Sequence, residues 1–350
     1  MLALLIWSLG IAALGIVALG IAVLVAGLVY QTLGVAKDAR QLPPPGRLIH
    51  AGSHRLHAHF SSGPSPTVVL EAGIGASSVS WTVVLQQLAG MARVCAYDRA
   101  GLGWSDSSNA PRTLANILRD FDAVISDPEI GRPFVLVGHS FGGMIALEYA
   151  CKHRDGLAGL VLVDPLTASE WRPLTAASNK MLARGVLLSR RGALLARLGV
   201  VRFTLALLTK GSRRIPKIFS RISSGNGAPL TERLVGEIQK LPPEVWPHIR
   251  AHWCQPKSFH SMADHLANLP VNAADCAAEC DLDDLPLIVL SAADSPASRM
   301  AEHQRIAGYS RCGRWLMAEG SGHWIQLDRP DLVVSAIMEV IGPSVTEPRA

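Results

Sequence analysis

The first 30 residues of the chain differ from all that follow because they contain no charged side chain. The stretch from Met1 to Tyr30 is apolar almost throughout, and about 20 apolar residues in a helix are enough to cross a hydrocarbon core of roughly 30 Å. The competing interpretation is a cleavable export signal, which has a positively charged start and an apolar stretch of only about 7 to 15 residues. Neither feature is present. We therefore predict a transmembrane helix at residues 1–30.

The next segment, residues 31–47, is predicted to be a linker, since the successive prolines Pro43–Pro45 stiffen the chain and exclude regular pairing. Lys37, Arg40 and Arg47 follow the apolar stretch, whereas only the amino terminus precedes it. The positive-inside rule then predicts a single-pass membrane protein whose folded domain faces the cytoplasm.

Beyond the linker, short apolar runs alternate with amphipathic segments. Residues 47–60 have the pattern of two short strands around a Gly-Ser turn. Further strands are expected at residues 67–73, 92–98, 133–138, 157–164, 285–294 and 314–319, and helices at residues 113–127, 141–154, 298–310 and 330–341. Continuous apolar strands separated by amphipathic helices indicate a mostly parallel sheet covered on both faces. We predict an α/β core made of residues 48–166 and 285–342, with the hairpin as its antiparallel edge.

The alternation stops in residues 167–284, which have the pattern of helices without a convincing strand. Because ligands of open α/β sheets bind at the carboxyl ends of the strands, an insertion here is expected to form a lid over those ends. Between Glu170 and Glu232 the insertion has many basic residues and no acidic one. Such a stretch suits an anionic membrane surface, although cations that are simply solvated on the outside of a lid fit equally well. Residues 343–350 are expected to form a tail.

Composition narrows the function classes. The net charge is only +5 and no nucleic-acid-reading motif is present, so nucleic acid is not an expected partner. Six scattered cysteines do not form a disulfide scaffold in a chain of this length and predict free thiols or a reducing compartment. The close pairs Cys276 with Cys280 and His57 with His59 lack further ligands nearby, so no metal site is expected.

The segment "VLVGHSFGGM" places Ser140 between an apolar strand and a helix. A serine on a sharp strand-to-helix turn takes a strained backbone conformation, which requires small residues at Gly138 and Gly142. Its hydroxyl is then exposed at the top of the sheet. The following helix supplies free N–H groups and a partial positive charge, which suit a developing oxyanion. Ser140 is therefore the candidate nucleophile.

A serine nucleophile requires a base and a carboxylate that orients the base. His323 lies in a small-residue loop after the last predicted strand and is the candidate base. For the acid, Asp294 ends the strand at residues 285–294 and is preferred because the order Ser, Asp, His along the chain is then satisfied. Asp164, at the end of another core strand, is the competitor.

Two N–H groups are expected to form an oxyanion hole. One belongs to Phe141, directly after the nucleophile, and the other to Ile74, in the loop after the strand at residues 67–73. Gly73 and Gly75 allow that loop to approach closely. This chemistry requires no metal and no organic cofactor.

Together the motifs "GHSFGG", "YDRAGLGWSD" and "GSGHW" resemble the α/β-hydrolase superfamily, over roughly residues 48–341 apart from the insertion. The resemblance implies an α/β-hydrolase fold and a catalytic triad. It also implies that Asp98–Asp106 forms a structural loop outside the site. A serine at position 140 argues against epoxide hydrolases and haloalkane dehalogenases, which use an aspartate there. The chain departs from many relatives in having Ala72-Gly73 instead of His-Gly, and "SAAD" without a glycine before Asp294.

The function expected from these features is a membrane-anchored serine hydrolase of carboxylesterase or lipase type that cleaves a small, apolar acyl substrate through an acyl-enzyme. The apolar insertion, with Trp246, Trp253 and Phe259, favours such substrates. One alternative is an aminopeptidase similar to proline iminopeptidases. The carboxylates that would receive its substrate's amino terminus are Glu232, Glu237, Glu244 and Asp264. The other is a slow or non-enzymatic ligand-binding receptor on the same fold. The sequence leaves the oligomeric state open.

Overall fold

In the computed structural model, the strands form one eight-stranded sheet with the order β1-β2-β4-β3-β5-β6-β7-β8. The structure describes residues 2–209, 240–277 and 279–342, so the expected tail at residues 343–350 lies outside the described residues. The strands are β1 (Arg47–Ala51), β2 (His54–Ser61), β3 (Val68–Glu71), β4 (Val94–Tyr97), β5 (Phe134–His139), β6 (Leu157–Val163), β7 (Leu287–Ala292) and β8 (Gly313–Ala318). Only the pairings of β2 with β1 and with β4 are antiparallel. The predicted parallel sheet with an antiparallel hairpin at its edge is confirmed.

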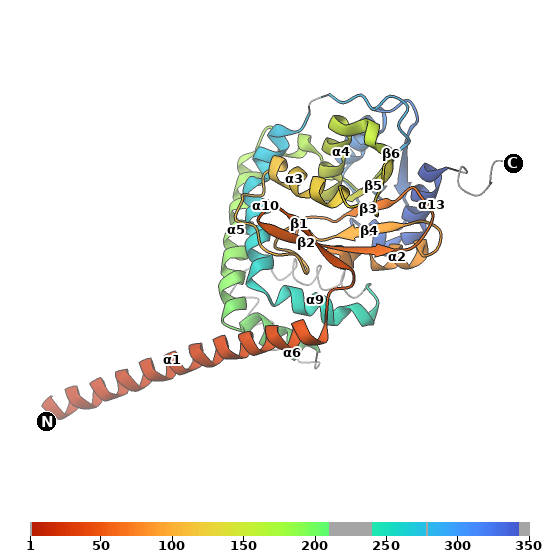
Figure 1. Ribbon diagram of the computed structural model, residues 1–350. Helices are drawn as coiled ribbons and strands as arrows, with labels where there is room; N and C mark the ends of the chain where they lie inside the picture. The colour runs from red at the N-terminus through yellow and green to blue at the C-terminus, as the bar shows by residue number, and fades with distance from the viewer. Residues whose placement is uncertain (1, 210–239, 278, 343–350) are drawn as a thin grey trace.

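Helices cover both faces of the sheet (Figure 1). The buried side chains of α3 (Leu114–Ile125), α4 (Phe141–His153) and α11 (Ala297–Ala307) share one apolar cluster with Leu136 of β5. Those of α2 (Thr82–Leu88) and α13 (Pro330–Ile341) share another with its neighbours Val135 and Val137. Successive residues of β5 therefore face opposite layers, as in a strand buried on both sides.

Within the described part of the insertion, residues 167–284 without 210–239 and 278, the ordered elements are all helical. They are η3 (Ala168–Trp171), α5 (Ala176–Arg197), α6 (Val200–Thr209), η4 (Pro243–Val245), α9 (Trp246–Trp253) and α10 (Pro256–Asp275). The ring of Phe259 fills the interface of α10 with α5, because a Cβ on Gly192 would lie 2.5 Å from it. The Ser261 hydroxyl donates to the Ala100 carbonyl at 2.8 Å. These contacts attach α10 to both α5 and the core. The short elements elsewhere are η1 (Ser78–Trp81), η2 (Arg154–Gly156) and α12 (Ile325–Asp328).

The first helix is longer than the sequence predicts. α1 runs without a break from Leu2 to Gln41 and projects from the domain (Figure 1). By length and composition it is able to cross a membrane. The prediction of a linker is wrong for residues 31–41, since the first prolines come only after Gln41 and the buried side chains Gln31 and Asp38 hold this part of the helix against the domain.

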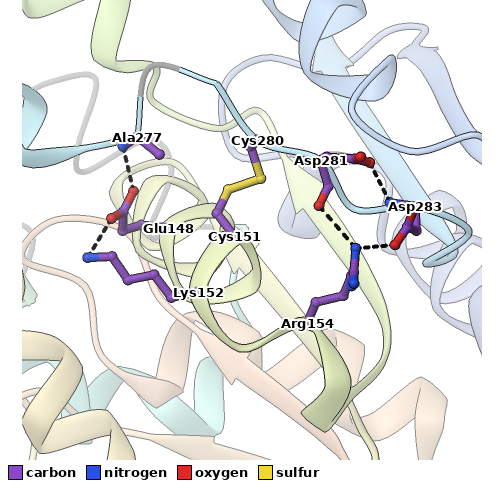
Figure 2. The surroundings of a disulfide bond; sticks show 8 residues. All are labelled: Glu148, Cys151, Lys152, Arg154, Ala277, Cys280, Asp281 and Asp283. Carbon is purple, nitrogen blue, oxygen red and sulfur yellow. Dashed lines mark hydrogen bonds and ion pairs between the residues drawn. A yellow bond between two sulfur atoms is a disulfide. The ribbon is translucent and has the colours of Figure 1, made fainter.

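A disulfide joins Cys151, in the last turn of α4, to Cys280, in the segment that leads from the insertion back to the core (Figure 2). The expectation of free thiols is therefore wrong for these two cysteines. They are 129 residues apart in sequence, and only the return of the chain from the insertion brings them together. The free cysteines are Cys95, Cys254, Cys276 and Cys312.

Candidate active site

Ser140 occupies the turn between β5 and α4 and has a φ of 54°, a conformation that a residue with a side chain rarely adopts. The turn permits no side chain at its glycines. A Cβ on Gly138 would lie 2.4 Å from the Gly142 carbonyl oxygen, and one on Gly142 would lie 2.5 Å from the Ala72 carbonyl oxygen. The two glycines are thus required by the close approach of backbone to backbone, as the sequence predicts.

His323, in the loop after β8, reaches the serine. Its Nε2 lies 3.0 Å from the Ser140 hydroxyl oxygen, which is hydrogen-bond distance. Its backbone carbonyl accepts a hydrogen bond from Nε2 of His139 at 2.9 Å. Burial lowers the pKa of His139, so this ring is neutral and its single N–H is used to hold the loop. Sequence reasoning missed His139, although its position directly before the serine was a usable signal.

Asp164, not Asp294, is the carboxylate that hydrogen-bonds His323. The distance from His323 Nδ1 to the Asp164 carboxylate is 2.6 Å. Asp164 is fully buried, and its other oxygen accepts from the Ala292 N–H at 3.0 Å and the Ser295 hydroxyl at 2.9 Å. Asp294 has an exposed side chain. The preference for Asp294 is therefore corrected in favour of its competitor.

The surroundings of Asp164 keep its carboxylate ionised. Burial alone would raise its pKa, but the hydrogen bonds from His323, Ala292 and Ser295 outweigh burial and lower the pKa below its usual range. The Arg299 guanidinium lies 3.8 Å from the same carboxylate and pairs with Glu170 of the insertion at 2.5 Å. An ionised acid beside Nδ1 fixes the tautomer of His323 in which Nε2 is free to accept a proton.

The loop after β3 lies directly against the serine. A Cβ on Gly73 would be 3.5 Å from the Cβ of Ser140. Arg99 holds this loop in place, since its guanidinium donates to the carbonyls of Ala72 and Gly73, each at 2.6 Å. Arg99 is itself paired with the buried carboxylate of Glu71. The "YDRAGLGWSD" motif thus supports the candidate oxyanion loop, a role that sequence reasoning did not assign to it.

The two candidate oxyanion donors belong to elements that meet at Ser140. Phe141 begins α4, so its N–H has no partner inside the helix. Ile74 follows Gly73 in the loop that Arg99 holds. Their roles as donors stay a prediction, and the position of both elements beside the serine supports it.

Asp98 and His57 form a structural cluster. The Asp98 carboxylate accepts from His57 Nδ1 at 2.8 Å and from the backbone N–H groups of Ser78 at 2.6 Å and Trp104 at 3.0 Å. His57, which is buried in β2, therefore ties the loop after Asp98 to the sheet. Among the described residues no group of three or more His, Cys, Asp or Glu side chains has the arrangement of a metal site.

The insertion covers the candidate oxyanion loop. A Cβ on Gly75 would lie 1.9 Å from the terminal methyl of Met262 in α10, and the ring of His265 meets Phe141 edge-on at 5.6 Å. Of the carboxylates considered for an aminopeptidase, Glu232 and Glu237 lie outside the described residues, whereas Glu244 and Asp264 are exposed. Neither exposed carboxylate offers a buried receptor for an amino terminus.

Comparison with known proteins concerns the fold. The family described as alpha/beta hydrolase fold matches residues 66–330. The chain is 35% identical over 112 residues to the uncharacterized protein YqjL of Bacillus subtilis, which is 32% of this chain and 44% of YqjL. It therefore spans less than half the length of the first curated relatives that it matches.

Two solved structures are similar in fold. A thermophilic esterase from Thermogutta terrifontis has a TM-score of 0.56 at 21% identity, over 84% of this chain and 96% of the esterase. An enol-lactonase from Burkholderia xenovorans LB400 has a TM-score of 0.57 at 20% identity, over 84% of this chain and 99% of the lactonase. At these identities the likeness shows the fold.

Proposed function

Since the chain belongs to the alpha/beta hydrolase fold family, we propose that it is a serine hydrolase that cleaves an ester or a related acyl bond through an acyl-enzyme. The observation that carries the proposal is the continuous hydrogen-bonded chain from Ser140 through His323 to Asp164, at 3.0 and 2.6 Å. A serine hydroxyl, an imidazole and a buried carboxylate in this order form the machinery of nucleophilic acyl transfer.

In the proposed reaction the Ser140 oxygen attacks the acyl carbon while Nε2 of His323 takes the hydroxyl proton. Asp164 stabilises the imidazolium that forms, and the N–H groups of Ile74 and Phe141 stabilise the oxyanion. The imidazolium then gives its proton to the leaving alcohol, which departs. Water, activated by His323 in the same way, releases the acid from Ser140. The balance of atoms is that of hydrolysis, and no cofactor takes part.

An active-site-directed fluorophosphonate probe tests the proposal. The wild-type protein is expected to be labelled at one site and the Ser140→Ala variant to remain unlabelled. Ser107→Ala, which removes an exposed hydroxyl outside the site, is the matched control and is expected to label like the wild type. Equal labelling of folded Ser140→Ala protein would exclude this serine as the nucleophile.

The proposed substrate is an apolar ester. The esterase and the enol-lactonase with this fold both act on ester bonds by their names, and the insertion that covers the site places an apolar side chain, Met262, on the oxyanion loop. Each additional buried CH₂ contributes about 0.8 kcal/mol at best. We expect kcat/KM on p-nitrophenyl esters to rise from acetate to a medium chain length. A steady fall beyond acetate would contradict an apolar pocket.

We further propose that α1 anchors the enzyme in a membrane with the folded domain on the oxidising side. The Cys151–Cys280 disulfide supports this side, because disulfides persist in oxidising compartments and are rare in the cytosol. The positive-inside rule favours the opposite side, and here it rests on three cations, Lys37, Arg40 and Arg47. We therefore give the disulfide more weight.

Alkaline phosphatase and fluorescent-protein fusions at the carboxyl terminus distinguish the two sides. An active phosphatase fusion is expected, together with a disulfide detected by mass spectrometry of the non-reduced protein. A fluorescent-protein fusion that matures while the phosphatase fusion is inactive would place the domain in the cytoplasm.

A further inference from the structure

The outward face of α5 combines cations with apolar side chains. It consists of Leu187, Arg190, Arg191, Leu194 and Arg197, all exposed and all within one arc of the helix by their spacing. The two leucines are 48% and 58% exposed, which is high for apolar side chains in a helix that packs on another. Within the described part of the chain, none of the three arginines forms an ion pair. The opposite face of α5 packs against α10 through Gly192.

This face lies where α1 leaves the domain. Residues 6–26 of α1 are exposed throughout, and the first direct contact is at Gly27, where a Cβ would lie 2.4 Å from the carbonyl oxygen of Leu198 at the end of α5. Figure 1 shows that α5 runs across the direction of α1 on the side of the domain from which α1 projects. A membrane crossed by the free part of α1 would therefore extend alongside α5.

The lengths agree with this placement. Residues 2–26 of α1 form about 37 Å of helix at 1.5 Å per residue, and the hydrocarbon core is about 30 Å thick. The part of α1 that is free of the domain thus ends at Gly27, at the level of the α5 end. The headgroup region would begin there, within reach of the Arg197 side chain.

A buried polar cluster fixes α1 at this position. Arg202 of α6 donates to the Gln31 side chain at 3.0 Å and pairs with Asp38 at 2.7 Å, and Gln31 donates to the Cys254 carbonyl at 2.7 Å. Gly34 lies directly against the Arg202 side chain, since a Cβ there would be 2.4 Å from Nε. These contacts join α1 to α6 and to the residue that follows α9, so the domain is not free to swing about the end of α1.

From this arrangement we propose that the outward face of α5 rests on the anionic headgroups of the membrane that α1 crosses. The inference rests on the membrane anchoring proposed above and not on the hydrolytic chemistry. Arginine guanidinium groups pair with phosphate oxygens, and the leucines between them enter the interface. Because α5 packs on α10, and α10 covers the oxyanion loop, the membrane surface lies two helices from Ser140. Substrates held in the lipid phase are thereby close to the site.

The test uses the full chain in lipid nanodiscs, with an environment-sensitive fluorophore on Leu194→Cys in a Cys312→Ser background. Discs of neutral phosphatidylcholine are compared with discs that include anionic phosphatidylglycerol. A blue shift and a gain in emission are expected with the anionic lipid, and both are expected to weaken at high salt. The same fluorophore on Met91→Cys, on another part of the surface, is expected to give no response.

The arginines are tested together as Arg190→Gln, Arg191→Gln and Arg197→Gln. At about fivefold per cation, the ratio of docked to undocked protein is expected to fall about a hundredfold. The matched control removes three exposed arginines elsewhere, Arg119, Arg311 and Arg314, and is expected to respond like the wild type.

An equal response of the two triple variants, or no response of the Leu194 fluorophore in anionic discs, would overturn the docking surface. Extraction of the protein from membranes by alkaline carbonate would instead refute the anchoring on which the inference rests. Neither of these measurements depends on activity. Failure of the docking surface or of the anchoring is therefore distinguishable from failure of the hydrolase proposal, which fluorophosphonate labelling of Ser140 tests separately.

Discussion

Replacement of Asp164 tests whether this carboxylate is the acid that supports His323. Asp164→Asn removes the negative charge 2.6 Å from Nδ1 but keeps an oxygen that accepts from Ala292 and Ser295, so the fold is expected to survive. An imidazolium and a carboxylate whose charge centres lie about 4 Å apart attract each other by about 4 kcal/mol at an effective dielectric constant of about 20. That energy corresponds to about 10³-fold in rate. The asparagine amide also favours the His323 tautomer that cannot accept the serine proton, which brings the expected loss to about 10⁴-fold.

The assay is kcat/KM on p-nitrophenyl acetate, together with the rate of fluorophosphonate labelling and the thermal midpoint of each variant. Asp294→Asn is the matched control, and as a change of an exposed residue it is expected to lower kcat/KM by less than about threefold. A larger loss in Asp294→Asn than in folded Asp164→Asn would exclude Asp164 as the acid, because the hydrogen bond of His323 would then not identify it.

Three predictions concern stability. Arg99→Met leaves the carboxylate of Glu71 buried without its cation, and chemical denaturation is expected to show a loss of about 3 to 5 kcal/mol; a loss below about 1 kcal/mol would mean that the pair is not needed. Replacing Cys151 and Cys280 by serine opens a cross-link between residues 129 apart and is expected to cost about 2 to 5 kcal/mol. The same loss on adding reductant to the wild type is the control, and an unchanged midpoint in both would contradict the disulfide. Burial opposes ionisation of Asp98, but its hydrogen bonds outweigh burial and lower its pKa. The ionised carboxylate therefore stabilises the fold at pH values above the pKa of an unfolded Asp, about 4, and this stabilisation is lost as the pH falls through the lower pKa of the folded state. The stability difference between wild type and Asp98→Asn is therefore expected to narrow from about pH 5 to about pH 3, and a difference independent of pH would contradict this sign.

The sheet could be predicted because its strands are local signals. Each core strand is a continuous apolar run bounded by turn residues. Between β5 and α4 the glycines on both sides of Ser140 indicate a sharp strand-to-helix turn. The final helix, Pro330–Ile341, begins at the proline and ends before a glycine, so both of its ends could be predicted from the sequence. The contact between Ser140 and His323 could be predicted for the same reason, since each residue is marked by its immediate neighbours.

The sequence could not decide between the two candidate acids, because the decision depends on which carboxylate lies beside His323 in space. Asp164 and Asp294 both end core strands, and both lie between Ser140 and His323 in the chain, so chain order satisfies either. What separates them in the structure is that Asp164 is buried 2.6 Å from His323 Nδ1, whereas the side chain of Asp294 is exposed. The disulfide, the support of the candidate oxyanion loop by Arg99 and the helix through residues 31–41 likewise depend on contacts between distant segments.

Rapid-quench mass spectrometry of the wild-type protein during turnover of a p-nitrophenyl ester tests whether Ser140 forms a covalent acyl-enzyme. A burst of p-nitrophenol close to one equivalent per enzyme is expected, together with the mass of one acyl group on the peptide that contains Ser140. Hydrolysis at the same rate without acylation of that peptide, or with the acyl group on another residue, would show that Ser140 is not the nucleophile.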